Sequence, residues 1–411
     1  MLKYIKVKNF YSIGESQKIS FEINPKDILD HSAREITLKD QTKTKLSINL
    51  VACVIGANGS GKSNFLKAIN FVISLVQNSY NYHSDKFLSV QHSLMKDKST
   101  TIEIGFVNNN SNYKYFIEFN STTILKEYLK KTVQREVNIF EMARKKNQVE
   151  IKSNIKINQT DKDRFASIER SHIPLLSSLI NTGYITDMLF FKTIDKGDDN
   201  MLKILSVPHK NGLMDALVRQ FELVDFQKKL HENQILLKNI IEIFKKIDSS
   251  IAEIKTSKGE FSETKEARYN IDLIHSSKNQ KFSLNFFQES HGTQQLILLL
   301  VQILPALENG GLVIIDEIES ALHPDLTQKL ISLFESKKTN PKNAQIIFST
   351  HQHPLIANRT KTQIYIAQKD NVKLATELYR LDDVEGVRND ENYYHKYMAG
   401  AYGGIPKISA L

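Results

Sequence analysis

Residues 56–63, GANGSGKS, form a glycine-rich stretch whose residue types and spacing suit the binding of a phosphate. They fit the pattern GxxxxGK[S/T], in which glycines let the backbone N–H groups turn toward a phosphate. In this pattern Lys62 reaches the β- and γ-phosphates of a nucleotide, and the Ser63 hydroxyl ligates Mg²⁺. A plain glycine-rich turn would need neither group, so we expect a nucleoside triphosphate site. The predicted contacts come from Gly56, Ala57, Asn58, Gly59, Ser60, Gly61, Lys62, Ser63 and Asn64.

Two carboxylates, Asp316 and Glu317, directly follow an apolar run at 312–315 that predicts a buried strand. In phosphate-loop ATPases a carboxylate at the end of such a strand holds Mg²⁺, which assigns Asp316 to the metal. A second carboxylate beside it can polarise the attacking water, which assigns Glu317 as the general base. A surface turn would explain the pair alone, but its combination with the 56–63 loop favours a catalytic site.

The apolar run at 345–348 predicts another strand, which ends at Ser349, Thr350 and His351. Open parallel α/β sheets bind ligands outside the carboxyl ends of their strands. We therefore expect His351 to hydrogen-bond the γ-phosphate and to sense its presence. The alternative is a structural histidine at a strand end.

A fourth candidate group, Ser290, Gly292, Thr293 and Gln294, precedes a strongly apolar helix. A serine and a glycine at a helix start present free N–H groups and a hydroxyl to an anion. A plain helix N-cap would explain the same residues.

The elements that must position these groups follow from the hydrophobic pattern. An apolar strand before the phosphate loop and an amphipathic helix after it are expected at 50–55 and from 62 onward. Further strands are expected at 2–23, 100–107, 114–120, 124–140, 269–275 and 281–287, and helices at 175–180, 214–226 and 230–247. Residues 24–46 are interpreted as a surface connection, and the polar stretches at 194–200 and 255–267 as flexible.

Composition bounds the class of protein. The chain has 411 residues, a net charge of +9 and a single cysteine, Cys53, so no disulfide forms within it. The basic excess is spread along the sequence, which permits an anionic partner such as nucleic acid but is also typical of a solvated surface. No apolar run is long enough to span a membrane and the N-terminus is not a signal peptide, so we expect a cytoplasmic protein with no membrane partner.

The order of these motifs resembles the ABC-type ATPases of the SMC/RecF class. Within that class the chain is similar to AAA-family phage-resistance, or abortive-infection, ATP-binding proteins of the RloA and AbiL type. The resemblance is carried by IKVKNFYSIGE, VIGANGSGKSNFLKAINFV, ESHGTQQL, IIDEIESALHPDL, FSTHQHPLI and YMAGAYGGIPKI. It covers both ends of the chain and is poor at 120–280.

The resemblance implies an α/β fold, an ABC-type P-loop ATPase head with a mixed or antiparallel N-terminal sheet, a parallel-sheet core and a helical insertion. The expected divisions are the N-terminal part of the head with the P-loop, a mainly helical insertion or lid, and the C-terminal part of the head, at 1–158, 159–265 and 266–411.

Such heads dimerise head to tail around two ATP molecules. The 290–294 segment would then be a signature that touches the γ-phosphate bound to the other copy, with a D-loop-like segment made of Ser320, Ala321, Leu322, His323 and Pro324. The signature departs from the transporter form LSGGQ, because it reads SHGTQ. The glutamine of the lobe-linking loop has no assigned position.

Three functions fit the sequence. The first is an ATP-hydrolysing switch, a homodimer or higher homo-oligomer, that controls a separate effector protein encoded nearby in anti-phage defence. The acidic residues after His351 (Asp382, Asp383, Glu385, Asp390 and Glu391) are interpreted as solvated surface, so a toxic activity would come from a partner or from the insertion. The second is a RecF/SMC-like DNA-repair ATPase that clamps DNA, and the third is a slowly hydrolysing, ATP-dependent scaffold.

Overall fold

The structure is a computed structural model of the 411-residue chain. It describes residues 1–24, 33–39, 43–81, 90–145, 148–188, 190, 226–248, 250–260, 267–277, 280–320, 322–370 and 372–406. The helix expected at 214–226, except for its last residue, and the polar stretch 194–200 lie outside the described residues.

A five-stranded sheet forms the centre of the fold, with the strand order β15-β16-β6-β17-β18. The first four strands are parallel and β18 is antiparallel to β17. Their bounds are β15 Leu312–Ile315, β16 Gln345–Ser349, β6 Val51–Ile55, β17 Ile364–Asp370 and β18 Ala375–Arg380. Every residue of β6 and β16 is buried, as expected for strands of a parallel sheet that is covered on both faces.

The two faces of this sheet carry different helices, because successive strand residues point to opposite sides. Ala52 and Val54 of β6 pack into a core with α1, Lys62–Asn78. Val51, Cys53 and Ile55 pack into a second core with α6, His291–Asn309, and α7, Pro324–Glu335. The central strand β6 therefore contributes side chains to both hydrophobic cores.

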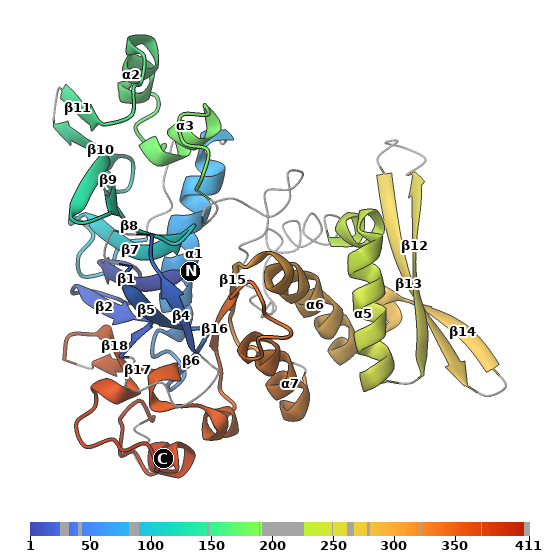
Figure 1. Ribbon diagram of the computed structural model, residues 1–411. Helices are drawn as coiled ribbons and strands as arrows, with labels where there is room; N and C mark the ends of the chain where they lie inside the picture. The colour runs from blue at the N-terminus through green and yellow to red at the C-terminus, as the bar shows by residue number, and fades with distance from the viewer. Residues whose placement is uncertain are drawn as a thin grey trace.

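A seven-stranded antiparallel sheet, with the order β11-β10-β9-β8-β7-β1-β2, lies on the α1 side and shares its core (Figure 1). Its strands are β1 Leu2–Lys8, β2 Gln17–Ser20, β7 Thr100–Asn108, β8 Ser111–Phe119, β9 Ile124–Thr132, β10 Glu136–Lys145 and β11 Gln148–Ser153. The short helices α2, Gln159–Ala166, and α3, Leu175–Asn181, bury Phe165, Leu175 and Leu176 in the same core. A small sheet of β3 Glu22–Ile23, β5 Lys45–Asn49 and β4 Ala33–Thr37 adjoins it.

A third unit packs on the α6 side and projects from the rest of the molecule (Figure 1). It consists of a helical stretch at 226–232, helix α5 Gln234–Ile247, and the sheet β12 Ile251–Glu260, β13 Ala267–Ser277 and β14 Gln280–Asn285. Helix α5 buries Leu236, Leu237, Ile240 and Phe244 in the second core.

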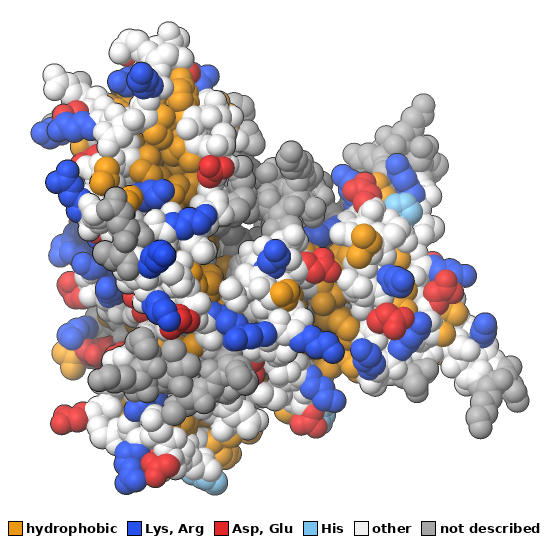
Figure 2. All heavy atoms as spheres, in the orientation of Figure 1, with side chains coloured by type: hydrophobic (Ala, Val, Ile, Leu, Met, Phe, Trp, Pro, Cys, Tyr) orange, Lys and Arg blue, Asp and Glu red, His pale blue; other side chains and the backbone are white. Residues whose placement is uncertain are grey.

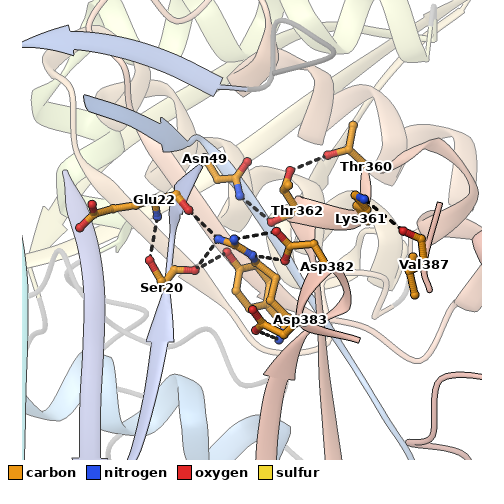
Figure 3. Close-up of polar contacts among 11 residues, drawn as sticks. Ser20, Glu22, Asn49, Thr360, Lys361, Thr362, Asp382, Asp383 and Val387 are labelled. Atoms are coloured by element: carbon orange, nitrogen blue, oxygen red, sulfur yellow. Dashed lines mark hydrogen bonds and ion pairs between the residues drawn. The ribbon is translucent and has the colours of Figure 1, made fainter. Parts of the chain in front are cut away.

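The segments after β16 close the fold against the N-terminal strands. They are η5 His353–Asn358, η6 Lys361–Gln363, η7 Leu381–Asp383 and α8 Tyr393–Met398. A further short helix, η2 Ser79–Asn81, directly follows α1. Arg380 donates to the carbonyl oxygens of Ser20, at 3.1 Å, and Glu22, at 2.6 Å, and forms an ion pair with Asp382. Figure 3 shows this cluster with the neighbouring bond from Asn49 to Thr362.

Several expectations need correction. The interval 24–46 is not only a surface connection, because it contains β4 and the start of β5. Residues 255–260 of the polar stretch 255–267 belong to the edge strand β12, where Glu253, Lys255 and Lys258 are exposed and interrupt the apolar pattern of a strand. The acidic residues after His351 are not all solvated: Asp382 pairs with Arg380, and Glu391, 8% exposed, pairs with Lys396.

The described elements within 159–265 pack into two different cores, and the domain boundaries stay a prediction. The helices α2 and α3 belong to the first core, whereas α5 and the strand β12 belong to the second. Among the described residues, no helix is long and apolar enough to cross a membrane.

Candidate nucleotide-binding site

The parallel register brings the ends of three strands to one edge of the central sheet. Ile315 of β15 pairs with Phe348 of β16, and Ser349 at the end of β16 pairs with Val54 of β6. The residues that follow these strands therefore meet at this edge. They are the phosphate loop after β6, the Asp316–Glu317 pair after β15, and the Thr350–His351 turn after β16.

The phosphate loop follows β6 and leads directly into α1, as the motif requires. Gly56, Gly59 and Gly61 all have positive φ, at 150°, 71° and 103°. A Cβ at Gly56 would collide with the carbonyl oxygen of Ala367, and one at Gly61 would collide with the hydroxyl of Thr376. Glycine is thus needed at both positions for the backbone angle and for the close approach of β17 and β18.

Lys62 is buried, with 5% of its surface exposed, and its ammonium group lies inside the loop. It donates to the carbonyl oxygens of Gly56, at 2.8 Å, and Ala57, at 3.0 Å. Burial lowers the pKa of Lys62 to about 8, while the charges of the carboxylates at 316, 317 and 319 act in the opposite direction. The ammonium group of Lys62 thus feels the charges of these carboxylates, and two of its three N–H groups bond the loop backbone.

Ser349 aligns the two carboxylates at the end of β15. Its hydroxyl donates to Oδ1 of Asp316 and accepts from the backbone N–H of Glu317 at 2.8 Å. The backbone of Glu317 has φ 52°, an unusual angle for a residue with a side chain. Asp316 is 8% exposed, whereas the side chain of Glu317 is 31% exposed and can reach solvent or a ligand.

His351 lies beside the expected general base. Its Nε2 is 3.4 Å from Oε1 of Glu317. Its backbone N–H donates to the carboxylate of Glu319, which joins the turn after β15 to the turn after β16. The charges of His351 and Lys62, together with burial as the largest cause, lower the pKa of the nearby His353.

The structure places Lys62, Asp316, Glu317 and His351 at the same edge of the sheet, and their roles stay predictions. It adds two positioning residues, Ser349 and Glu319. The sequence places Ser349 at the end of a predicted strand. It does not indicate that the Ser349 hydroxyl is buried and aligns two carboxylates. Glu319 is the last residue of the sequence DEIE at 316–319. A third carboxylate so close to the other two is the signal in the sequence that could have indicated its role.

The 290–294 segment is the N-terminus of α6. Ser290 is the N-cap, and its hydroxyl accepts from the N–H of Thr293 at 3.1 Å. The side-chain amide of Gln294 donates to the carbonyl oxygen of Glu289 at 2.9 Å. The capping interpretation is therefore correct, and Ser290 and His291 are also exposed. A role for this segment toward a second copy stays a prediction.

The D-loop-like segment continues from Glu317 as a turn. The N–H groups of Ser320 and Leu322 donate to the carbonyl oxygens of Glu317 and Glu319, at 2.9 Å each. His323 caps α7 and Pro324 is its first residue. Ala321 lies outside the described residues, and the role of the segment stays a prediction.

A magnesium ion fits this donor set. Among the described residues, no group of three or more His, Cys, Asp or Glu side chains could hold a metal ion. Mg²⁺ needs no such cage, because it is usually bound by one or two protein oxygens together with water and substrate phosphates. Ser63 and Asp316 supply oxygens of this type.

A strand–loop–helix phosphate loop and a strand-end acidic pair on a parallel sheet define a P-loop nucleotide-binding protein of the α/β class. The family model described as "AAA domain, putative AbiEii toxin, Type IV TA system" matches residues 51–358, and the chain belongs to this family.

Other known proteins are also similar to this chain. Structural maintenance of chromosomes protein 3 of Arabidopsis thaliana is 41% identical over 78 residues, which are 18% of this chain and 6% of that protein. The crystal structure of the SmcHead bound to the C-winged helix domain of ScpA covers 92% of this chain and 96% of its own, with 14% identity and a TM-score of 0.43. The SMC head domain from Thermotoga maritima covers 92% of this chain and 98% of its own, with 15% identity and a TM-score of 0.37.

Proposed function

We propose that this protein binds and hydrolyses ATP with Mg²⁺ and acts as an ABC-type switch. In this proposal two or more copies assemble head to tail around ATP and control a separate effector protein in anti-phage defence. The observation that carries the ATPase assignment is the contact between Glu317 and His351 at the sheet edge that also holds Lys62. The family name, with its reference to a toxin system, supports the defence context.

The chain's own residues account for each chemical task. Lys62 and the loop N–H groups bind the phosphates, and Ser63 and Asp316 would hold Mg²⁺, which neutralises phosphate charge when it is bound. Glu317 accepts a proton from the attacking water as the bond from that water to the γ-phosphorus forms and the bond to ADP breaks. His351, beside Glu317, donates to the γ-phosphate. Hydrolysis removes the γ-phosphate, and this removal would change the contact that His351 makes.

The base assignment is tested with Glu317→Gln, which keeps the size of the side chain and removes its charge. We expect ATP to stay bound and hydrolysis to fall by at least about a hundredfold, the lower limit of the usual contribution of a general base. Glu385→Gln is the control, because Glu385 is exposed and outside the site. Hydrolysis at the wild-type rate by Glu317→Gln would show that Glu317 is not the base, and full ATP affinity of Lys62→Ala would overturn the loop assignment.

The head-to-tail assembly is tested at Ser290, which caps α6 and is exposed. Ser290→Asp and Ser290→Asn both keep a good helix cap, but only Asp places a negative charge where a partner's γ-phosphate would lie. In the Glu317→Gln background with ATP, we expect light scattering to report a dimer or larger assembly for the parent and for Asn, and monomers for Asp. Equal masses for Asp and Asn would refute the trans contact.

A DNA clamp is the alternative that the net charge of +9 keeps open. On the face shown in Figure 2, lysines and arginines are dispersed among acidic side chains. The two functions are separated by measuring the ATPase rate with and without duplex DNA over a salt series. Stimulation that collapses as salt rises would favour the clamp.

Co-purification with the product of a neighbouring gene would favour the effector switch. Slow turnover with ATP-dependent assembly and no partner would favour the scaffold.

A further inference from the structure

The glycine-rich end of the described chain returns to the phosphate loop. We call residues 397–404, YMAGAYGG, the C-terminal strap. The carbonyl oxygen of Gly404 accepts a hydrogen bond from the backbone N–H of Ala57, at 2.8 Å. It accepts a second bond from the hydroxyl of Tyr397, at 3.0 Å. The first turn of the loop is therefore tied to a residue almost 350 positions away in the sequence.

The strap is also hydrogen-bonded to β17 and β18, the two strands that lie against the phosphate loop. The N–H of Gly404 donates to the side chain of Gln368 in β17, at 3.3 Å. The hydroxyl of Tyr379 in β18 donates to the carbonyl oxygen of Tyr402, at 2.6 Å. The same pair of strands supports the loop directly, because the Thr376 hydroxyl in β18 donates to the carbonyl oxygen of Ser60 at 2.8 Å. The C-terminal strap, the strands β17 and β18, and the phosphate loop thus form one hydrogen-bonded unit.

Both adjacent glycines of the strap are required by this packing. Gly403 and Gly404 have φ of 76° and 72°. A Cβ on Gly403 would lie 2.6 Å from the Tyr379 hydroxyl, and one on Gly404 would lie 2.5 Å from a methyl of Ile366. A side chain at either position would push the strap off β17 and β18 and pull the Gly404 carbonyl away from Ala57.

The strap also contacts the turn that carries the candidate switch histidine. The ring of Tyr397 lies 5.0 Å from the ring of His353, centroid to centroid. The backbone N–H of His353 in turn donates to the carbonyl oxygen of His351, at 3.1 Å. Tyr397, which is 1% exposed, therefore contacts both the anchor of the phosphate loop and the neighbour of His351.

We propose that the C-terminal strap positions the phosphate loop, with Tyr397 and Gly404 as positioning residues for nucleotide binding. This proposal rests on the proposed ATP site and adds to it a requirement for residues far outside the nucleotide-binding motifs. In this proposal the strap acts through the loop backbone at Ala57. It holds the first turn of the loop so that the following N–H groups keep the curvature that a phosphate needs.

The main test compares Gly404→Ala with Gly386→Ala. Both glycines have left-handed backbone angles, with φ of 72° and 83°, so both substitutions carry a similar backbone cost. A Cβ on Gly386 meets nothing within 4 Å, whereas a Cβ on Gly404 displaces the strap. Binding of a fluorescent ATP analogue should weaken at least about tenfold in Gly404→Ala and stay within about twofold of wild type in Gly386→Ala.

A second pair removes only a hydroxyl. Tyr397→Phe loses the bond to Gly404, and Tyr393→Phe loses a bond of similar length, 3.0 Å, from the same helix to the carbonyl of Arg388. Each is measured for ATP affinity and for the midpoint of thermal unfolding without nucleotide. We expect Tyr397→Phe to lower affinity about two- to tenfold, and Tyr393→Phe to leave it unchanged, with similar shifts of the unfolding midpoint.

The outcomes separate this inference from the proposed function. If the wild-type protein binds no ATP, the proposed function fails. If the wild type binds ATP, Lys62→Ala does not, and both strap variants bind like their controls, the ATP site stands and the strap proposal is refuted. Reciprocal coupling gives a further check, because ATP should slow amide hydrogen exchange in 397–404 more than around Gly386.

Discussion

Replacing Ser349 by alanine tests how the acidic pair is aligned. The hydroxyl of Ser349 is fully buried and makes two bonds: it donates to the Asp316 carboxylate and accepts from the N–H of Glu317 at 2.8 Å. Alanine would remove both without a steric clash. The carboxylate would lose a donor in a site that is shielded from water, and the Glu317 N–H would lose its acceptor.

The expected cost follows from these two bonds. A hydrogen bond to a charged group contributes about 1.5–3 kcal/mol, and a neutral one about 0.5–1.5 kcal/mol. The free energy of unfolding should therefore fall by roughly 2–4 kcal/mol. ATP hydrolysis should also fall, because both Asp316 and Glu317 lose the group that orients them.

Urea denaturation followed by far-UV circular dichroism measures the stability change, since the chain has no tryptophan. Ser177→Ala is a matched control, because Ser177 is also fully buried and its hydroxyl has no hydrogen-bond partner within the described chain. The control should lose little stability. If Ser349→Ala costs no more than Ser177→Ala, the aligning role of Ser349 is refuted.

Three further predictions use pH and a single substitution. Burial lowers the pKa of Lys62 to about 8, so the ammonium form that binds phosphate is lost above that pH, and ATP affinity should fall by up to about tenfold per pH unit; a flat profile from pH 7 to 9.5 would contradict this. Burial raises the pKa of Glu127, which is 0% exposed, to about 7. The native state then binds more protons than the unfolded state between about pH 4.5 and 7, so the free energy of unfolding should decrease as pH rises through this window, and Glu127→Gln should remove that slope. Glu319→Gln should keep ATP affinity within about threefold but lower the hydrolysis rate. The reason is that the hydrogen bond from the His351 N–H weakens when its acceptor at residue 319 loses its charge. An unchanged hydrolysis rate would refute a positioning role for Glu319.

The nucleotide site was largely predictable because its signals are local. The loop at 56–63 and the pair at 316–317 each sit at the end of an apolar strand, and the rule that parallel strands bind ligands at their carboxyl ends brings them together. Strand β15 begins and ends where its apolar run does. In contrast, Ser349 needed knowledge of the register between β15, β16 and β6, which no single segment contains.

Other parts were not predictable for identifiable physical reasons. Strand β12 lies at the edge of its sheet, and its exposed Glu253, Lys255 and Lys258 obscure the alternation of a strand. Asp382 looked like a surface residue because its partner, Arg380, is oriented by carbonyl groups of Ser20 and Glu22, more than 350 residues earlier. The glycines at 403–404 belong to a segment that carries the family resemblance, but the hydrogen bond between Gly404 and Ala57 forms only in the folded chain.

The position of β6 between β16 and β17 has a consequence for the protein during its synthesis. Residues 51–55 have no sheet neighbours until the segments around 345 and 364 have left the ribosome. At 5–20 residues per second this interval lasts roughly 15–60 seconds. For that time the buried strand VACVI is an unpaired, apolar and aggregation-prone segment, which makes the nascent chain a natural client for a chaperone.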